Sequence, residues 1–92
     1  MTVSAMEFRI TGRVQGVSFR AWTREQAVAR GLSGWVRNAP DGTVRARLEG
    51  PSEALAAMHE ALHHGPPGAR VEQVEARQAV PDPALADFEI LR

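Results

Sequence analysis

The sequence contains neither cysteine nor lysine, and each absence removes several kinds of chemistry. Without cysteine the chain forms no disulfide, offers no thiolate nucleophile and holds no cysteine-ligated zinc or iron–sulfur cluster. Without lysine there is no catalytic amine and no phosphate-binding lysine of the P-loop kind. All 11 basic residues are therefore arginine. A small chain that does without disulfides is compatible with the cytosol, and we expect a cytoplasmic protein.

An excess of one charge and a long apolar run are missing as well. The chain has 11 basic and 11 acidic residues and a formal net charge of zero, so it lacks the broad basic surface typical of nucleic-acid binding. No apolar run approaches the ~18–20 residues that cross a bilayer, and the N-terminus does not resemble a secretory signal. We therefore expect no nucleic-acid partner and no membrane partner. The 92 residues suit one domain, residues 1–92, with a modest core.

Apolar periodicity divides the chain into strands and helices. Alternation of apolar and polar side chains predicts half-buried strands, helical spacing predicts two helices, and the sequence "PDG" predicts a hairpin turn. The segments are a strand at 6–11, a helix at 18–30, strands at 34–38 and 43–49, a helix from 51 or 52 to 64, and strands at 71–80 and 87–91. This order predicts an α+β fold, the ferredoxin-like split βαβ sandwich, with an antiparallel sheet, two helices on one face and a short additional C-terminal strand.

Several local features follow from the same patterns. Ser18 is expected to cap the first helix and Gly31 to end it. In the strand at 71–80 the alternation of apolar and polar residues shifts by one position, which indicates a bulge. Glu49 is expected to face solvent with the other charged residues of its strand. The buried stripe of the first helix is predicted to consist of Phe19, Trp22 and Ala29, with Ala21, Val28 and Leu32 beside it.

A glycine loop at residues 12–16 joins the first strand to the first helix, and Arg20 follows in the first helical turn. The backbone N–H groups of such a loop form a concave nest, to which the helix N-terminus adds its free amides. A phosphate-like dianion bound there would compensate the Arg20 guanidinium, which otherwise adds to the positive end of the helix dipole. A structural turn with an arginine reaching solvent explains the local pattern equally well. The glycine spacing fits neither the dinucleotide-binding nor the P-loop pattern.

Asn38 ends the second predicted strand, directly before "APDG". Asparagine is a common turn residue, so a structural role is a sufficient explanation. In the split βαβ topology, however, the first loop and the end of the second strand share one edge of the sheet. An amide at that edge could orient a water molecule while the loop holds a phosphoryl group.

The stretch "GRVQGVSFR", followed by "GLSGWVRN", "DGTV", "LEG" and a closing "FEI", resembles the acylphosphatase family. The similarity runs from Phe8 to Ile90, in the same order and with the same spacing. It implies the same ferredoxin-like sheet with two helices. It also implies an enzyme that hydrolyses acyl phosphates, small mixed carboxylic–phosphoric anhydrides, to a carboxylate and inorganic phosphate, with no metal and no cofactor.

The resemblance also implies roles for individual residues. The phosphate-binding arginine of the family falls on Arg20, and its water-orienting asparagine falls on Asn38. Some members have a hydroxyl residue after the asparagine, where this chain has Ala39, so no role of that hydroxyl is transferred. The phosphate cradle falls on the backbone amides of Gln15, Gly16, Val17, Ser18 and Phe19.

Other functions fit parts of the sequence. A non-catalytic phosphate- or small-molecule-binding module is the main alternative, because ferredoxin-like folds also bind ligands without turnover. An RNA-binding module is a weaker one, because "VRARLEG" places no aromatic residue on its strand for base stacking. His59 and His63 have the i, i+4 spacing of a ligand pair but no evident third ligand, so we expect no metal site. We expect Trp22 and Trp35 to pack and the protein to be a monomer.

Overall fold

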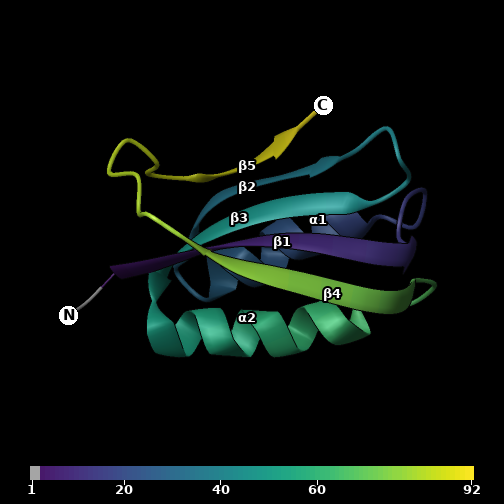
Figure 1. Ribbon diagram of the computed structural model, residues 1–92, viewed down its shortest axis with the longest axis horizontal. Coiled ribbons are helices and arrows are strands. Elements are labelled where there is room, and N and C mark those ends of the chain that lie inside the picture. Colours follow the sequence, from purple (N-terminus) through teal and green to yellow (C-terminus); the bar gives the residue numbers. More distant parts are fainter. Residues whose placement is uncertain (1–2) are drawn as a thin grey trace.

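The computed structural model describes residues 3–92, which form two helices and five strands (Figure 1). Every predicted element is present, with boundaries displaced by a few residues. Neither helix in this part of the chain has the length and hydropathy needed to span a bilayer. The elements in chain order are β1 Val3–Arg13, α1 Phe19–Ala29, β2 Ser33–Asn38, β3 Val44–Pro51, α2 Ser52–His64, β4 Arg70–Ala79 and β5 Phe88–Leu91.

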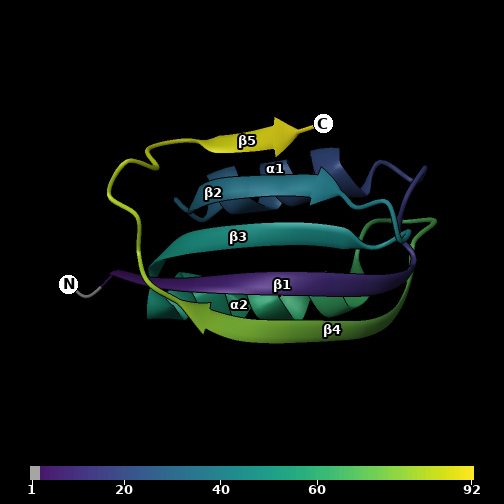
Figure 2. The same ribbon diagram turned by 45° about the horizontal axis from the view of Figure 1, so that its top comes forward.

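The five strands form one sheet in the order β4-β1-β3-β2-β5. Strand β1 pairs antiparallel with β3 and β4, and β2 pairs antiparallel with β3. Both helices cover the same face, α1 over β2 and β5 and α2 over β1, β3 and β4 (Figure 2). This is the predicted ferredoxin-like sandwich. One detail differs from the expectation of an antiparallel sheet, because β5, which forms an edge of the sheet, pairs parallel with β2.

The core lies between the helices and the sheet. Strand positions that alternate in the sequence alternate between core and surface in the structure, as predicted, and helix α2 buries three residues at i, i+3 and i+7. The buried apolar residues that meet in this layer are Phe8, Ile10, Val14, Phe19, Ala27, Leu32, Val36, Val44, Ala46, Leu48, Leu55, Met58, Leu62 and Phe88.

Helix α1 buries a different set of residues from the one that the sequence predicted. The helix buries Phe19, Thr23 and Ala27, at i, i+4 and i+8, and Trp22 packs partly against the core. A polar residue can occupy this stripe because the Thr23 hydroxyl donates a hydrogen bond of 2.8 Å to the Phe19 carbonyl. Ala29, predicted in the stripe, and Ala21 and Val28, predicted beside it, lie exposed instead.

Glu49 was expected to face solvent, but it is only 4% exposed. Its carboxylate accepts a hydrogen bond of 2.7 Å from Arg47 Nε and one of 2.9 Å from the Asp82 backbone N–H. Arg47 also donates to the Val80 carbonyl. The segment between β4 and β5 thus covers Glu49, and a buried carboxylate with two donors is tolerated where an unpaired one would not be. Alternation along β3 could not reveal this cover, which comes from a distant part of the chain.

Two glycines permit close contacts between strands. Gly12, predicted in the loop, lies in β1 at the point where the register with β4 shifts, which confirms the predicted bulge. A Cβ on Gly12 would lie 2.1 Å from the Arg70 carbonyl oxygen. A Cβ on Gly34 in β2 would lie 1.8 Å from the Arg47 carbonyl oxygen of β3. Only glycine lets these backbones pair at such distances.

We expect Gly34→Ala to lower the free energy of unfolding by about 3 kcal/mol or more, because the new methyl group forces β2 away from β3. Gly42→Ala is the matched control. Gly42 also has a positive φ, +89°, but a Cβ there meets no atom within 4 Å, so strain alone should cost about 1 kcal/mol. Urea unfolding of both variants measures the difference. Equal losses would contradict the steric explanation.

Candidate active site

The loop after β1 and the turn after β2 lie at the same end of the sheet (Figure 1). Strands β1 and β2 both run antiparallel to β3, so their C-termini lie at the same end of the sheet. Strand β5 runs parallel to β2, so its C-terminus lies at this end of the sheet too. Three segments that are far apart in the sequence therefore converge beside the N-terminus of α1.

Apolar side chains anchor the loop at residues 14–18. Val14 is 1% exposed and Phe19 2% exposed, and Val17 packs partly against the core. Between these anchors, Gly16 and Ser18 adopt positive φ angles of 74° and 61°. Within residues 3–92, no backbone N–H of residues 15–19 donates a hydrogen bond to a backbone carbonyl. The loop is thus held in place by packing while its amides remain available to a ligand.

Ser18 occupies the predicted N-cap position of α1, but its side chain makes no capping hydrogen bond. It is the one non-glycine residue with a positive φ among the described residues. The left-handed conformation replaces the extended backbone that a capping serine normally adopts. The strain of this conformation is a local cost that commonly marks a functional site.

Arg20 lies in the first turn of α1, which contains no acidic residue. Across the described part of the chain, no carboxylate oxygen lies within 4.0 Å of its guanidinium. The guanidinium and the helix N-terminus are therefore two positive groups with no protein anion between them. This arrangement favours an anion from solution.

Arg20 and Asn38 line the same open pocket, whose volume is about 500 Å³. Three of the five predicted cradle residues, Gly16, Ser18 and Phe19, line it too. Gln15 and Val17 do not, since Val17 packs toward the core and the Gln15 side chain turns to the β2–β3 connection. The structure thus brings Arg20, Asn38 and most of the loop into one site. The Asn38 side chain has no hydrogen-bond partner among residues 3–92.

Four further residues line the pocket, Val14, Ala21, Ile90 and Arg92, and sequence reasoning missed the two from the C-terminal segment, Ile90 and Arg92. They are there because β5 pairs in parallel with β2, with Ile90 opposite Val36. Knowing this pairing would have identified them. The sequence of β5 specifies neither its edge nor its direction, so no local signal indicated them.

The Gln15 side chain joins the loop to the β2–β3 turn. Its Nε2 donates hydrogen bonds of 2.8 Å to the Ala39 carbonyl and 3.0 Å to the Thr43 carbonyl. Within the turn, the Thr43 hydroxyl and backbone N–H donate to Asp41, which lowers the pKa of that carboxyl to about 2. Asn38 directly precedes this turn. Gln15 therefore ties the loop at residues 14–18 to the turn that follows Asn38.

We expect Gln15→Ala to lower the free energy of unfolding by about 1–3 kcal/mol, because two carbonyl groups lose their donor. Turnover should fall as well, since Asn38 loses its fixed position relative to the loop. Urea unfolding and steady-state kinetics measure the two effects. Gln73→Ala, on the exposed part of β4, is the control and should change neither. Full activity of Gln15→Ala would contradict a positioning role.

The histidines lie away from this pocket. His59 and His63 stack on helix α2 with ring centroids 5.3 Å apart, and His59 also meets the edge of Phe8 at 5.2 Å. Among residues 3–92, no three histidine, aspartate or glutamate side chains cluster so as to hold a metal ion.

Comparison with known proteins identifies the family of this chain. The family model described as "Acylphosphatase" matches residues 6–90. An acylphosphatase of Azorhizobium caulinodans is 54% identical over 81 residues, which cover 88% of this chain and 87% of the relative. The crystal structure of an acylphosphatase from Bacillus subtilis superimposes with a TM-score of 0.93 at 33% identity, over 99% of this chain and 100% of that one. An acylphosphatase structure from Coxiella burnetii gives a TM-score of 0.93 at 31% identity, over 97% and 93%. The chain therefore belongs to the acylphosphatase family and is an enzyme that hydrolyses acyl phosphates.

Proposed function

We propose that Arg20 and the loop amides bind the phosphoryl group of an acyl phosphate and that Asn38 orients the water that attacks it. The observation that carries the proposal is the shared pocket, in which Arg20 and Asn38 face one space beside the N-terminus of α1. Neither side chain has an ion-pair partner or hydrogen-bond acceptor in the described residues. Both are free to serve a ligand.

Phosphoryl transfer needs little covalent chemistry from a protein. The transition state spreads negative charge over three equatorial oxygens, with the attacking and leaving oxygens roughly in line. Donors that are already in position stabilise this charge without reorganising. The amides of residues 15–19 and the helix N-terminus supply such donors, and the Arg20 guanidinium adds a planar fork that matches two phosphate oxygens.

Asn38 holds the attacking water with its side-chain amide, opposite the leaving carboxylate. Asparagine does not act as a general base, and none is required. A carboxylate is a good leaving group that departs without protonation, and the proton of the water passes to the phosphate. The products are one carboxylate and inorganic phosphate.

The positive groups of this site suffice for the reaction without a metal ion. We further propose that the enzyme acts as a monomer, since every group assigned to the reaction comes from one chain. Its location in the cytoplasm stays a prediction from the sequence.

Turnover of benzoyl phosphate in the presence and absence of EDTA tests the metal-free mechanism. We expect the same kcat and KM in both conditions. A loss of turnover in EDTA that is restored by a divalent cation would overturn the mechanism. Phosphate binding without any turnover would instead favour a non-catalytic binding module.

A further inference from the structure

The face of the sheet that carries no helix displays a row of three arginines. Arg9 of β1 lies directly opposite Arg45 of β3, and Arg45 lies directly opposite Arg37 of β2. Like charges in directly opposed positions of an antiparallel pair are destabilising. Nearby anions are therefore needed to offset the repulsion between these guanidinium groups.

The protein supplies too few of these anions. Arg9 forms ion pairs with Glu75 at 2.8 Å and with Asp41 at 3.3 Å. Asp41 also lies 3.9 Å from Arg45, so one carboxylate serves two guanidinium groups. In residues 3–92, Arg37 has no carboxylate within 4.0 Å, and its Cζ lies 5.7 Å from the centre of the Trp35 ring. The uncompensated charge is thus concentrated at the β2 end of the row.

A second row of charged residues lies two positions further along the strands, and in this row the positive and negative charges are equal in number. Glu7 pairs with Arg47 at 2.9 Å and with Arg77 at 2.8 Å, and Arg47 also pairs with Glu49 at 2.7 Å. These two arginines face two carboxylates. Glu89 of β5, in register with Trp35, adds a further carboxylate beside this second row, so the local excess of positive charge lies in the first row and not over the whole face.

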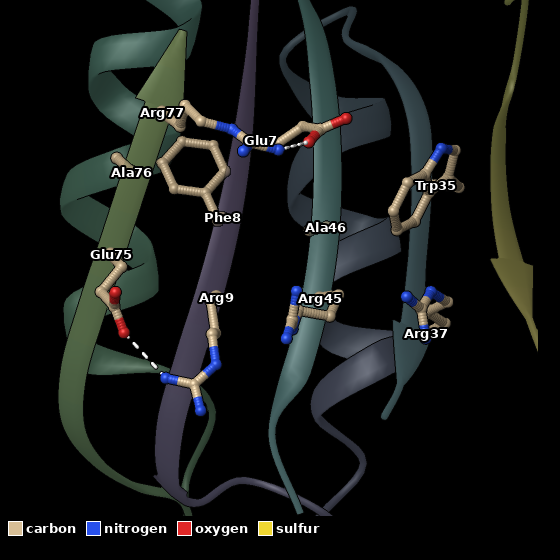
Figure 3. A pocket seen from close by; sticks show the side chains of 10 residues that line it. All are labelled: Glu7, Phe8, Arg9, Trp35, Arg37, Arg45, Ala46, Glu75, Ala76 and Arg77. Carbon is tan, nitrogen blue, oxygen red and sulfur yellow. Dashed lines mark hydrogen bonds and ion pairs between the residues drawn. The ribbon is translucent and has the colours of Figure 1, made fainter. Parts of the chain in front are cut away.

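An open groove of about 470 Å³ runs across the four strands β4, β1, β3 and β2 (Figure 3). Four arginines and two glutamates line it, together with Trp35 and three residues, Phe8, Ala46 and Ala76, that lie in register across its middle. Its volume is that of a small-molecule site. It shares no lining residue with the pocket that contains Arg20 and Asn38.

We propose that this groove binds a free mononucleotide, with its phosphate against Arg37 and Arg45 and its base against Trp35. Guanidinium groups bind phosphate oxygens in pairs, and both tryptophan rings and guanidinium planes stack on nucleobases. Trp35 and Arg37 are two residues apart on one strand and point to the same face, with Cα atoms about 7 Å apart and the Arg37 Cζ 5.7 Å from the centre of the Trp35 ring. This spacing suits the base and the phosphate of one nucleotide. The formal net charge of zero favours a single nucleotide over a long polyanion.

Isothermal titration with adenosine 5′-monophosphate tests this proposal. We expect saturable binding that weakens by about tenfold or more in Arg37→Ala and in Arg45→Ala and that declines with added salt. Adenosine alone and inorganic phosphate alone should not reproduce it at this site. In a Trp22→Phe background, in which Trp35 is the one tryptophan left, the nucleotide should change the tryptophan emission.

Two control variants locate the binding. Arg70→Ala removes the same charge from β4 outside the groove and should leave the affinity unchanged. Arg20→Ala should also leave it unchanged, whereas loss of binding in that variant would place the nucleotide in the catalytic pocket and overturn the proposal. Equal affinity of wild type, Arg37→Ala and Arg45→Ala would overturn it too, as would tighter binding of a single-stranded oligonucleotide. The melting temperature of each variant establishes that it is folded, and Arg45→Ala should not lower it, because Arg45 is flanked by two like charges.

Discussion

Arg20→Ala is expected to lower kcat/KM for benzoyl phosphate by at least about 10²–10³-fold, the effect of removing one fixed donor from a charged transition state. The guanidinium has no carboxylate partner in the described chain and lines the pocket with Asn38. After its removal, the loop amides and the helix N-terminus must hold the phosphoryl oxygens without this guanidinium. Steady-state kinetics on the purified variant measure the loss.

The control for this experiment lies on the same helix. Arg24→Ala removes an equal charge, but Arg24 is exposed and contacts the Phe88 carbonyl at 3.3 Å, outside the pocket. Its kinetics should stay close to those of the wild type. Arg20→Lys keeps the charge and loses the planar fork, so its activity should lie nearer to that of Arg20→Ala. Wild-type kinetics of Arg20→Ala would remove Arg20 from the mechanism.

Asn38→Ala is expected to lower kcat by a similar factor, about 10²-fold or more, because the attacking water loses its orientation. The variant should remain folded, since the Asn38 side chain makes no hydrogen bond to the rest of residues 3–92. Kinetics and thermal melting on one preparation separate the two effects. Ser33→Ala, at the other end of β2, is the control. A large fall in melting temperature with proportionate loss of activity would indicate a structural role instead.

Family membership decides between the functions that the sequence left open. A glycine loop with an unpaired arginine fits a phosphate-binding module as well as a hydrolase. The match to acylphosphatases extends over residues 6–90 and includes close relatives at about half identity, so the hydrolase is the supported function. The RNA-binding alternative has no comparable support.

Local patterns predicted most of the fold because most of its strands are half-buried. Alternation identified β1 and β3, and "PDG" identified the hairpin between β2 and β3. The two errors have different causes. Glu49 is buried by the connection after β4, a distant segment that leaves no mark on the sequence around Glu49. Thr23 is polar, so the apolar pattern of helix α1 excluded it from the buried stripe, although its hydroxyl is satisfied by the Phe19 carbonyl of the same helix.

The candidate site also contains residues that the sequence predicted and residues that it did not. The loop, Arg20 and Asn38 could be predicted, because the loop has a recognisable pattern and the topology places Asn38 beside it. The Gln15 side chain could not, because its acceptors are backbone carbonyls of Ala39 and Thr43, which sequence does not distinguish from any others. Ile90 was missed because β5 pairs with β2, a strand about 50 residues earlier in the sequence, and this pairing has no local sequence signal.

Thermal melting with inorganic phosphate tests directly whether Arg20 binds the phosphoryl group and Asn38 does not. At tenfold above its dissociation constant, phosphate stabilises a protein that binds it by about 1.4 kcal/mol, which corresponds to roughly 6–11 °C for a domain of this size. We predict this rise for the wild type and for Asn38→Ala, which keeps the phosphate site, and none for Arg20→Ala. Equal shifts in all three proteins would contradict the account, because Arg20 would then not be the partner of the phosphoryl group.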